Sequence, residues 1–264
     1  MKISVVSKLL EHQTPEEAID ISARIGYRGI ELFGIPEHLP PSTPSDKVRD
    51  LATRARDRGL NVTVLGTYVG YFSQLGDKDC EKQVEDFKRF VEMAHIFACP
   101  MVRVWTGGPL PQAAREDHWM RAAHYVRECA DIGLREGLVI MIETIQVLPV
   151  TIAAIQKLLR LIDRPNVGIV YDPGGMFNYD PDYGVPAVRR LGRHIQDVHL
   201  KDRNKEGVQF MGEGMLDYPA LIRALREEGY DGYYAVECHK EHSVATVERE
   251  YRAACELLGA AGVA

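Results

Sequence analysis

Short apolar segments alternate with longer amphipathic segments along the whole 264-residue chain, and this alternation constrains the fold more than any other feature. The apolar segments are almost continuously hydrophobic, which is typical of parallel strands that are covered on both faces. The expected strands are 3–6, 29–33, 61–65, 101–105, 138–142, 167–170, 195–200 and 232–236. The expected helices are 14–25, 45–58, 77–98, 112–136, 151–162, 185–191, 218–228 and 244–258.

Eight strand–helix units in a chain of this length favour a single closed (β/α)8 barrel of the α/β class. A doubly wound sheet alternates in the same way, but no glycine-rich fingerprint follows the first expected strand. The sequence contains no linker or low-complexity tract, so residues 1–264 are expected to form one domain.

Charge and cysteine content restrict the partners and the compartment. The net charge of −6, from 32 basic and 38 acidic residues, argues against a nucleic acid partner. No apolar run is long enough for a membrane span, and the first residues do not resemble a signal peptide. The five cysteines include no C-x-x-C pair, which fits a reducing cytoplasm. A cytoplasmic protein without a membrane partner is expected.

Four consecutive strands in the second half of the sequence each carry a possible metal ligand. Glu143, Asp172 and Glu237 directly follow apolar runs, and His199 lies near the end of another. The carboxyl ends of barrel strands form one face, where such enzymes carry out their chemistry. Three carboxylates and one imidazole suit one divalent ion, with Mn²⁺ expected first and Co²⁺, Mg²⁺ or Zn²⁺ as alternatives.

Each of these residues has a simpler interpretation when taken alone. Glu143 or Glu237 could be a helix cap or an ion-pair partner, and Asp172 could start a turn before Pro173. His199 could be a buried histidine with satisfied hydrogen bonds. The occurrence of all four on successive strands favours the metal site.

Other polar residues near the strand ends are weaker candidates for substrate binding. Glu31 ends the second strand, and Arg103 and Trp105 lie on the fourth, where Trp105 could equally be a core residue. Lys201 and Arg203 follow His199 closely. Lys201 could stabilise an enolate or form a surface ion pair.

The loop after the seventh strand contains Gly212-Glu213-Gly214, and two polar residues follow Glu237. Barrels often bind phosphate in that loop, although a plain turn explains the glycines as well. His239 and Lys240 are weaker site candidates still.

The sequence resembles the sugar phosphate isomerase/epimerase superfamily, the xylose isomerase-like or AP-endonuclease-family-2 barrels, over essentially its whole length. The resemblance is carried by Gly26-Tyr27-Arg28-Gly29-Ile30-Glu31, Ile142-Glu143-Thr144, Tyr171-Asp172-Pro173-Gly174, Val198-His199-Leu200-Lys201-Asp202, Gly212-Glu213-Gly214-Met215-Leu216-Asp217-Tyr218 and Gly229-Tyr230-Asp231-Gly232-Tyr233-Tyr234-Ala235-Val236-Glu237.

The resemblance implies a metal held by Glu143, Asp172, His199 and Glu237. In the ketose 3-epimerases of that family two metal-bound glutamates act as acid and base, and Glu143 and Glu237 match them. Two departures stand out. Gly175 replaces a histidine that epimerases and hydroxypyruvate isomerases usually carry, and Ile145 replaces a histidine of many relatives.

These observations predict a metal-dependent isomerase or epimerase of a small sugar or polyhydroxy ketone. The expected reaction is proton abstraction next to a metal-bound carbonyl, through an enediolate. A dehydratase acting like those on inosose or dehydroshikimate is the first alternative, and a non-catalytic sugar-binding or partner subunit is the second. A homo-oligomer is compatible with the sequence.

Overall fold

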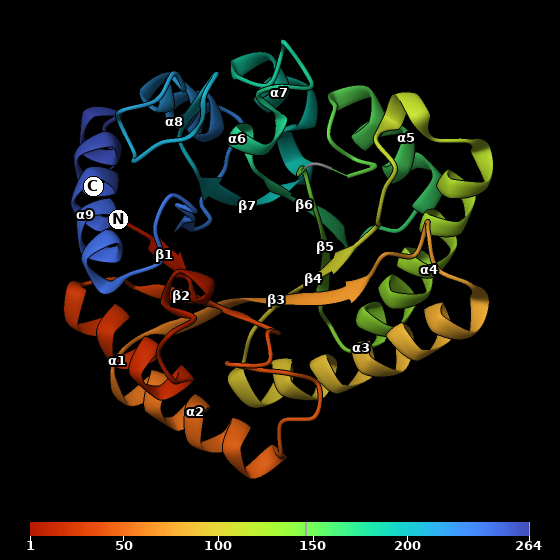
Figure 1. Cartoon of the computed structure of the whole chain (residues 1–264), viewed down its shortest axis with the longest axis horizontal. Helices are drawn as coiled ribbons and strands as arrows, with labels where there is room; N and C mark the ends of the chain where they lie inside the picture. The colour runs from red at the N-terminus through yellow and green to blue at the C-terminus, as the bar shows by residue number, and fades with distance from the viewer. Residues whose placement is uncertain (146, 264) are drawn as a thin grey trace.

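The computed structural model describes residues 1–145 and 147–263, which form a closed barrel of parallel strands surrounded by helices (Figure 1). The order around the barrel is β1-β10-β7-β6-β5-β4-β3-β2. The barrel strands are β1 (Ile3–Val6), β2 (Gly29–Phe33), β3 (Asn61–Gly70), β4 (Met101–Trp105), β5 (Val139–Glu143), β6 (Val167–Tyr171), β7 (Ile195–Leu200) and β10 (Tyr234–Val236). The predicted α/β barrel is confirmed.

The longer helices pack around the outside of the barrel (Figure 1). They are α1 (Pro15–Ile25), α2 (Ser45–Asp57), α3 (Asp77–Phe97), α4 (Glu116–Arg135), α5 (Ile152–Ile162), α7 (Val185–Leu191), α8 (Tyr218–Glu227) and α9 (Val244–Ala260). Shorter elements lie in the loops: η1 (Ser7–Leu10), η2 (Pro111–Ala113), α6 (Pro173–Met176), η3 (Gly192–His194) and the hairpin β8 (Arg203–Asn204) with β9 (Gly207–Val208). Among the described residues, none of the helices combines the length and apolar character needed to cross a membrane.

The barrel closes where the first and last strands meet. β1 pairs in parallel with both β2 and β10, and α9 packs against α1 and β1. The N-terminus therefore lies beside α9, which carries the C-terminus (Figure 1). Closure leaves no free sheet edge and brings the carboxyl ends of the first and last strands to the same face.

The start and end of α1 follow the sequence signals. The Thr14 side chain accepts a hydrogen bond from the Glu17 amide, and the Glu17 carboxylate accepts one from the Thr14 amide. Gly26 ends the helix with a φ of 116°, a conformation that L side chains rarely adopt. Local capping therefore sets both ends of this helix.

Several element boundaries differ from the prediction, three of them as follows. β3 continues to Gly70 instead of ending at residue 65, because its end pairs with Trp105 of β4. α4 begins at Glu116 instead of 112, because Pro111 starts a separate 3-10 turn. The last barrel strand begins at Tyr234, two residues later than expected.

The apolar core lies between the strands and the helices, where residues such as Ile142 and Ile169 are fully buried. The barrel interior is different, because charged side chains of β2, β4 and β7 are also fully or almost fully buried there. Glu31, Arg103 and Asp197 each expose at most 1% of their surface. Such groups need compensating partners, since an isolated buried charge is very costly.

The loop after β7 is organised by the buried carboxylate of Asp202. Its Oδ2 atom accepts hydrogen bonds from the amides of Gly212 and Gly214, each at 2.9 Å. These amides are therefore already bonded inside the protein, which supports the plain-turn interpretation of the glycines over a phosphate site.

Glu250 of α9 binds a backbone amide of the same loop. It is 1% exposed, and both of its carboxylate oxygens accept from the Met211 amide at 3.2–3.3 Å. Burial raises the pKa of Glu250 to about 7, and the Met211 amide and Arg249 offset only part of that effect, while Asp202 and Glu213 add to it. The folded protein thus favours the protonated form of this residue.

Replacing Glu250 by glutamine is expected to change how stability depends on pH. Between about pH 4.5 and pH 7 native Glu250 holds a proton in the folded protein but releases it on unfolding, so its contribution to stability falls as pH rises. Glutamine stays neutral throughout this range. The free energy of unfolding of Glu250→Gln should therefore exceed that of the native protein by about 1–3 kcal/mol at pH 8 and by little at pH 5. Urea unfolding at both pH values measures this.

Glu248→Gln, on the exposed side of the same helix, is the control and should give no such difference. Parallel pH profiles for the native protein and Glu250→Gln would contradict the role of burial.

Candidate metal centre

Four side chains converge at the carboxyl ends of four neighbouring strands. Glu143 is the last residue of β5, Asp172 follows β6, His199 lies in β7 and Glu237 follows β10. One ligand atom from each lies within 4.8 Å of those of the others, and all four residues are buried. The structure thus brings together the four residues that the sequence singled out.

His199 lies at the centre of this cluster. Its Nδ1 atom is 3.0 Å from Glu237 Oε2 and 3.1 Å from Glu143 Oε1. Its Nε2 atom faces the opposite way, 3.3 Å from Glu31 Oε2 and 3.7 Å from Asp197 Oδ2. The imidazole therefore separates two groups of carboxyls, one toward the mouth and one deeper in the barrel.

Lys201 bridges Asp172 and Glu237. Its Nζ atom donates to Asp172 Oδ2 at 2.7 Å and lies 2.5 Å from Glu237 Oε2. The other oxygen of Asp172 accepts from the Gly175 amide at 2.8 Å, which makes Asp172 the cap of α6. The cap and the lysine together fix the orientation of the carboxylate.

Arg103 holds Glu143 from the side of β4. Its Nη1 atom donates to Glu143 Oε2 at 2.7 Å, and Nη2 donates to the Thr67 carbonyl at 3.3 Å. Its guanidinium lies over the rings of Phe33 and Trp105, 4.5 and 5.1 Å from their centroids. The stacking stabilises a cation that would be costly to bury alone.

Charge governs the protonation of this cluster. Burial would raise the pKa of Glu143, but Arg103 and His199 outweigh it and leave that pKa below its ordinary value. For Glu237, Lys201 and His199 likewise outweigh burial, and its pKa falls well below the ordinary value. Both glutamates are thus held as carboxylates.

The pKa values of His199 and Asp172 are raised instead. Burial would lower the pKa of His199, but the carboxylates of Glu237, Glu31 and Glu143 raise it well above the ordinary value. Burial raises the pKa of Asp172, and Lys201 offsets only part of that rise. The cluster as a whole demands more positive charge than its lysine and arginine provide.

The set of donors and its charge fit a divalent cation. Five buried carboxyl groups face the cations of Arg103 and Lys201 and the imidazole of His199, and burial together with Glu31 raises the pKa of Asp197 well above its ordinary value. The carboxyl groups therefore outnumber the positive charges even when His199 is protonated. In addition, Glu143 Oε1 has no hydrogen-bond partner among the described residues. Oxygen-rich donor sets with one imidazole are the ligands of divalent ions such as Mn²⁺ and Zn²⁺.

The weaker candidates of the sequence lie in different places. Glu31 and Arg103 are inside the barrel, Lys201 is within the cluster, and Trp105 stacks beside Arg103. Arg203 donates to the Gly174 carbonyl at 3.0 Å, next to the loop that carries Asp172. Their roles in substrate binding stay predictions.

Sequence reasoning missed two groups near the site, Asp197 and Tyr68, and could not show which partners the weaker candidate His239 contacts. Asp197 precedes His199 by two residues, so strand alternation places both on the same face, and this signal was available. His239 contacts Glu237 Oε1 at 3.0 Å and continues to His242 at 3.1 Å, a link that only the folded protein reveals. Tyr68 belongs to the part of β3 that the prediction left out.

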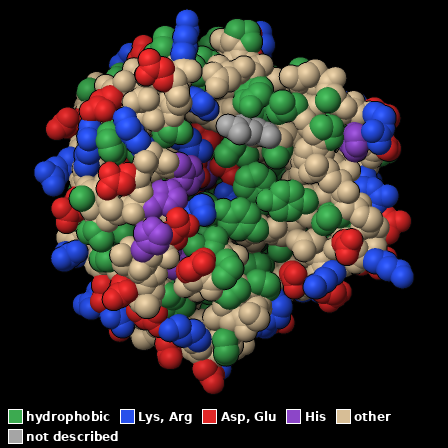
Figure 2. Space-filling view, viewed as in Figure 1, with side chains coloured by type: hydrophobic (Ala, Val, Ile, Leu, Met, Phe, Trp, Pro, Cys, Tyr) green, Lys and Arg blue, Asp and Glu red, His purple; other side chains and the backbone are tan. Residues whose placement is uncertain are grey.

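The face of the molecule over this cluster is hollowed near its centre (Figure 2). Acidic and basic side chains are visible in the hollow, histidines lie on one side, and hydrophobic side chains form the other side (Figure 2). The polar cluster therefore has an asymmetric entrance.

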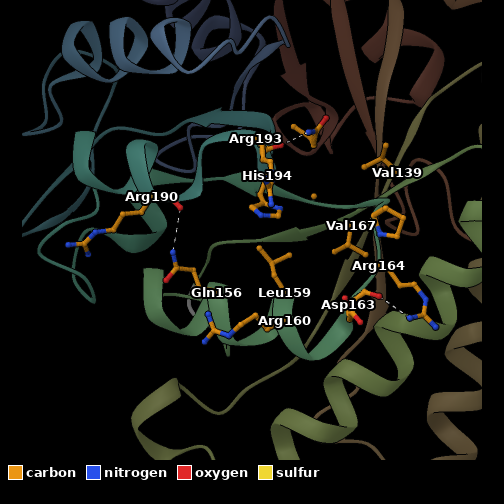
Figure 3. A pocket seen from close by; sticks show the side chains of 13 residues that line it. Val139, Gln156, Leu159, Arg160, Asp163, Arg164, Val167, Arg190, Arg193 and His194 are labelled. Carbon is orange, nitrogen blue, oxygen red and sulfur yellow. Dashed lines mark hydrogen bonds between the residues drawn. The ribbon is translucent and has the colours of Figure 1, made fainter.

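A second hollow of about 930 Å³ lies outside the barrel at the opposite end, between α5 and α7 (Figure 3). Its walls include Val139 and Val167, the first residues of β5 and β6. His194 and Leu159 point into it, whereas the guanidinium groups of Arg160 and Arg190 point toward its edge (Figure 3). It shares no lining residue with the metal cluster.

Comparisons with known proteins agree with this architecture. A family model described as the xylose isomerase-like TIM barrel matches residues 19–261. An inosose dehydratase of Geobacillus kaustophilus is 24% identical over 89% of this chain and 83% of its own length. An inosose isomerase of Bacillus velezensis is 22% identical over 94% of this chain and 91% of its own length.

A solved structure described as the IOLI protein with a bound zinc atom has the same fold. Its TM-score is 0.82 at 19% identity, and the match covers 98% of both chains.

Proposed function

The chain belongs to the xylose isomerase-like TIM-barrel family, and from that premise we propose that it is a divalent-metal-dependent enzyme acting on a small polyhydroxy ketone. The reaction begins with removal of a proton from the carbon next to the carbonyl group, and its primary outcome is isomerisation or epimerisation. The observation that supports this proposal is that Glu143, Asp172, His199 and Glu237 converge in one buried cluster that is rich in carboxyl groups.

A divalent ion bound there supplies electrophilic polarisation of a carbonyl oxygen at neutral pH. The expected metal is Mn²⁺, with Zn²⁺, Co²⁺ and Mg²⁺ as alternatives. Glu143, Asp172, His199 and Glu237 would hold it.

The protein's own groups handle the proton. Glu143 and Glu237 are carboxylates at neutral pH and lie on either side of His199 Nδ1, so each can accept a proton from a substrate carbon in the hollow. Lys201 Nζ, held by Asp172 and Glu237, is a fixed donor for a substrate oxygen that gains negative charge. Burial of the cluster excludes water and strengthens these interactions.

A dehydratase is the second candidate, and Gly175 favours it. Many epimerases that this sequence resembles carry a histidine there. A Cβ atom on Gly175 would lie only 2.7 Å from the Thr144 carbonyl oxygen and 2.8 Å from Asp172 Oδ2. This backbone therefore leaves no space for that side chain, and a relative that matches over 89% of this chain is named as an inosose dehydratase.

Metal content tests the site. The native protein should hold about one divalent ion per molecule by plasma mass spectrometry after reconstitution with Mn²⁺, Co²⁺, Mg²⁺ or Zn²⁺. Glu143→Gln, Asp172→Asn, His199→Ala and Glu237→Gln each remove one donor or its charge and should lose most of that metal. A folded native protein that takes up none of the four ions would contradict the proposal and favour a non-catalytic binding subunit.

Deuterium exchange tests the chemistry and separates the two outcomes. In D₂O the metal-loaded protein should introduce deuterium next to the carbonyl of an inosose or a ketohexose. Isomerisation conserves the mass of the substrate apart from deuterium, whereas dehydration releases one water. Glu143→Gln and Glu237→Gln should slow the exchange by about 10²–10⁴-fold. Exchange at the native rate in both variants would exclude them as proton carriers.

Glu31 is expected to act on the metal through His199. A histidine that binds a metal usually donates its other ring N–H to a carboxylate, and Glu31 Oε2 is the nearest acceptor to Nε2. Glu31→Ala should therefore weaken metal binding by about 10–100-fold in a chelator competition. Glu31→Gln keeps an acceptor oxygen and should stay near the native affinity, and equal affinities for native protein and Glu31→Ala would disprove the contact's role.

A further inference from the structure

A chain of hydrogen bonds leads from Glu237, one of the proposed metal ligands, to the surface of the protein. The Nε2 atom of His239 lies 3.0 Å from Glu237 Oε1, and the Nδ1 atom of His239 lies 3.1 Å from His242 Nε2. The chain ends at Glu11, whose Oε1 atom accepts a hydrogen bond from His242 Nδ1 at 2.6 Å. We call His239, His242 and Glu11 the histidine chain. Their side chains are 18–28% exposed, whereas that of Glu237 is 3% exposed.

The histidine chain crosses the seam at which the barrel closes. His239 and His242 lie in the loop between β10 and α9, and Glu11 directly follows η1, the element after β1. Burial would raise the pKa of Glu11, but hydrogen bonds from His242 and Lys8 outweigh it and lower that pKa to about 2. The outer end of the chain is therefore a carboxylate that two partners hold in place.

The two carboxylate oxygens of Glu237 have different partners. Oε2 faces the cluster, 3.0 Å from His199 Nδ1 and 2.5 Å from Lys201 Nζ. Oε1 contacts His239 instead. Because both oxygens are bonded to one planar carbon, a partner on Oε1 also limits where Oε2 can lie. The contact with His239 therefore restricts rotation of the carboxylate and keeps Oε2 directed toward the cluster.

Glu143, the other proposed proton carrier, is oriented in a different way. It is the last residue of β5, and the buried Arg103 of the neighbouring strand β4 donates to its Oε2 atom at 2.7 Å. Glu237 instead lies just beyond β10, and His239 belongs to the loop that follows. Strand pairing does not fix a side chain in that loop, so the position of His239 depends on its contact with His242.

We propose that His239 is a positioning residue that orients the carboxylate of Glu237 for metal binding and proton transfer, and that His242 and Glu11 hold His239 in that position. His239 acts through Glu237, and His242 acts through His239. This inference rests on the proposed function, because it assigns the residues that keep one of its metal ligands and proton carriers in place.

Metal affinity measures the effect of the histidine chain on the cluster. His239→Ala should weaken Mn²⁺ binding by about 10–100-fold in a chelator competition, because it removes a partner of a metal-binding side chain. His242→Ala should weaken binding by about 3–10-fold, a smaller loss because His239 remains but lacks its support. His242→Gln keeps a polar group beside His239 and should stay near the native affinity. His12→Ala removes an exposed histidine next to Glu11 and is the control, with native affinity expected.

The double variant His239→Ala/His242→Ala tests whether the two histidines act in series. If His242 acts only through His239, the double variant should bind Mn²⁺ with the same affinity as His239→Ala alone. A further loss in the double variant as large as that of His242→Ala alone would show that the two act independently, and would overturn the proposal.

A second measurement does not depend on the metal. In protein labelled with ¹³C at the glutamate carboxyl groups, the signal of Glu237 is identified by its absence in Glu237→Gln. The chemical shift of a carboxyl carbon responds to hydrogen bonding, so His239→Ala and His242→Ala should both move this signal. His242→Gln and His12→Ala should leave it near its native position.

Native metal affinity in His239→Ala, or a Glu237 signal that neither alanine variant moves, overturns the proposal. Equal losses of affinity in His12→Ala and His242→Ala also overturn it, because they would reflect general loosening of the protein. Failure of the proposed function is distinguishable, because the native protein would then take up no metal while the Glu237 signal still responds to His242→Ala.

Discussion

The excess of negative charge inside the barrel is the constraint on which the rest of the site depends. Glu143 and Glu237 remain carboxylates although they are buried, because Arg103, Lys201 and His199 outweigh the cost of burial. Each of these cations is itself held in place, Arg103 by aromatic rings and Lys201 by two carboxylates. Removing one partner of such a network exposes the others to the full desolvation penalty, so the cluster behaves as a unit.

The barrel fold can accommodate this concentration of buried charge. The hydrophobic core between strands and helices stabilises the protein independently of the interior, which frees inward-facing positions of β2, β4 and β7 for polar residues. Parallel strands then carry successive donors to one face, with Glu143 and His199 in strands and Asp172 and Glu237 directly after them. His199 uses this geometry twice, since one ring nitrogen faces Glu143 and Glu237 while the other faces Glu31.

The sequence predicted the strands and the four converging residues because both depend on regular spacing. Apolar runs that end in Glu143 or Asp172 identify the strand and its end together. Parallel pairing of neighbouring strands then brings these ends to one face of the barrel. The end of β3 could not be predicted, because Gly70 continues the strand through its pairing with Trp105, the last residue of the neighbouring strand β4. The start of α4 was missed because a 3-10 turn interrupts an otherwise helical pattern. Contacts within and between loops, such as that of His239 with His242, leave no periodic signal.

The two halves of the barrel contribute different residues to the site. Glu143, Asp172, His199 and Glu237 lie in or directly after β5, β6, β7 and β10. Three stacked aromatic rings, Tyr68, Trp105 and Tyr71, come from β3, β4 and the loop that joins β3 to α3. Arg103 of β4 links the two parts, since its guanidinium lies over the Trp105 and Tyr68 rings and binds Glu143. Residues of the opposite half can therefore vary while the strands that hold the charged cluster keep their geometry, which is how one barrel fold can serve different reactions.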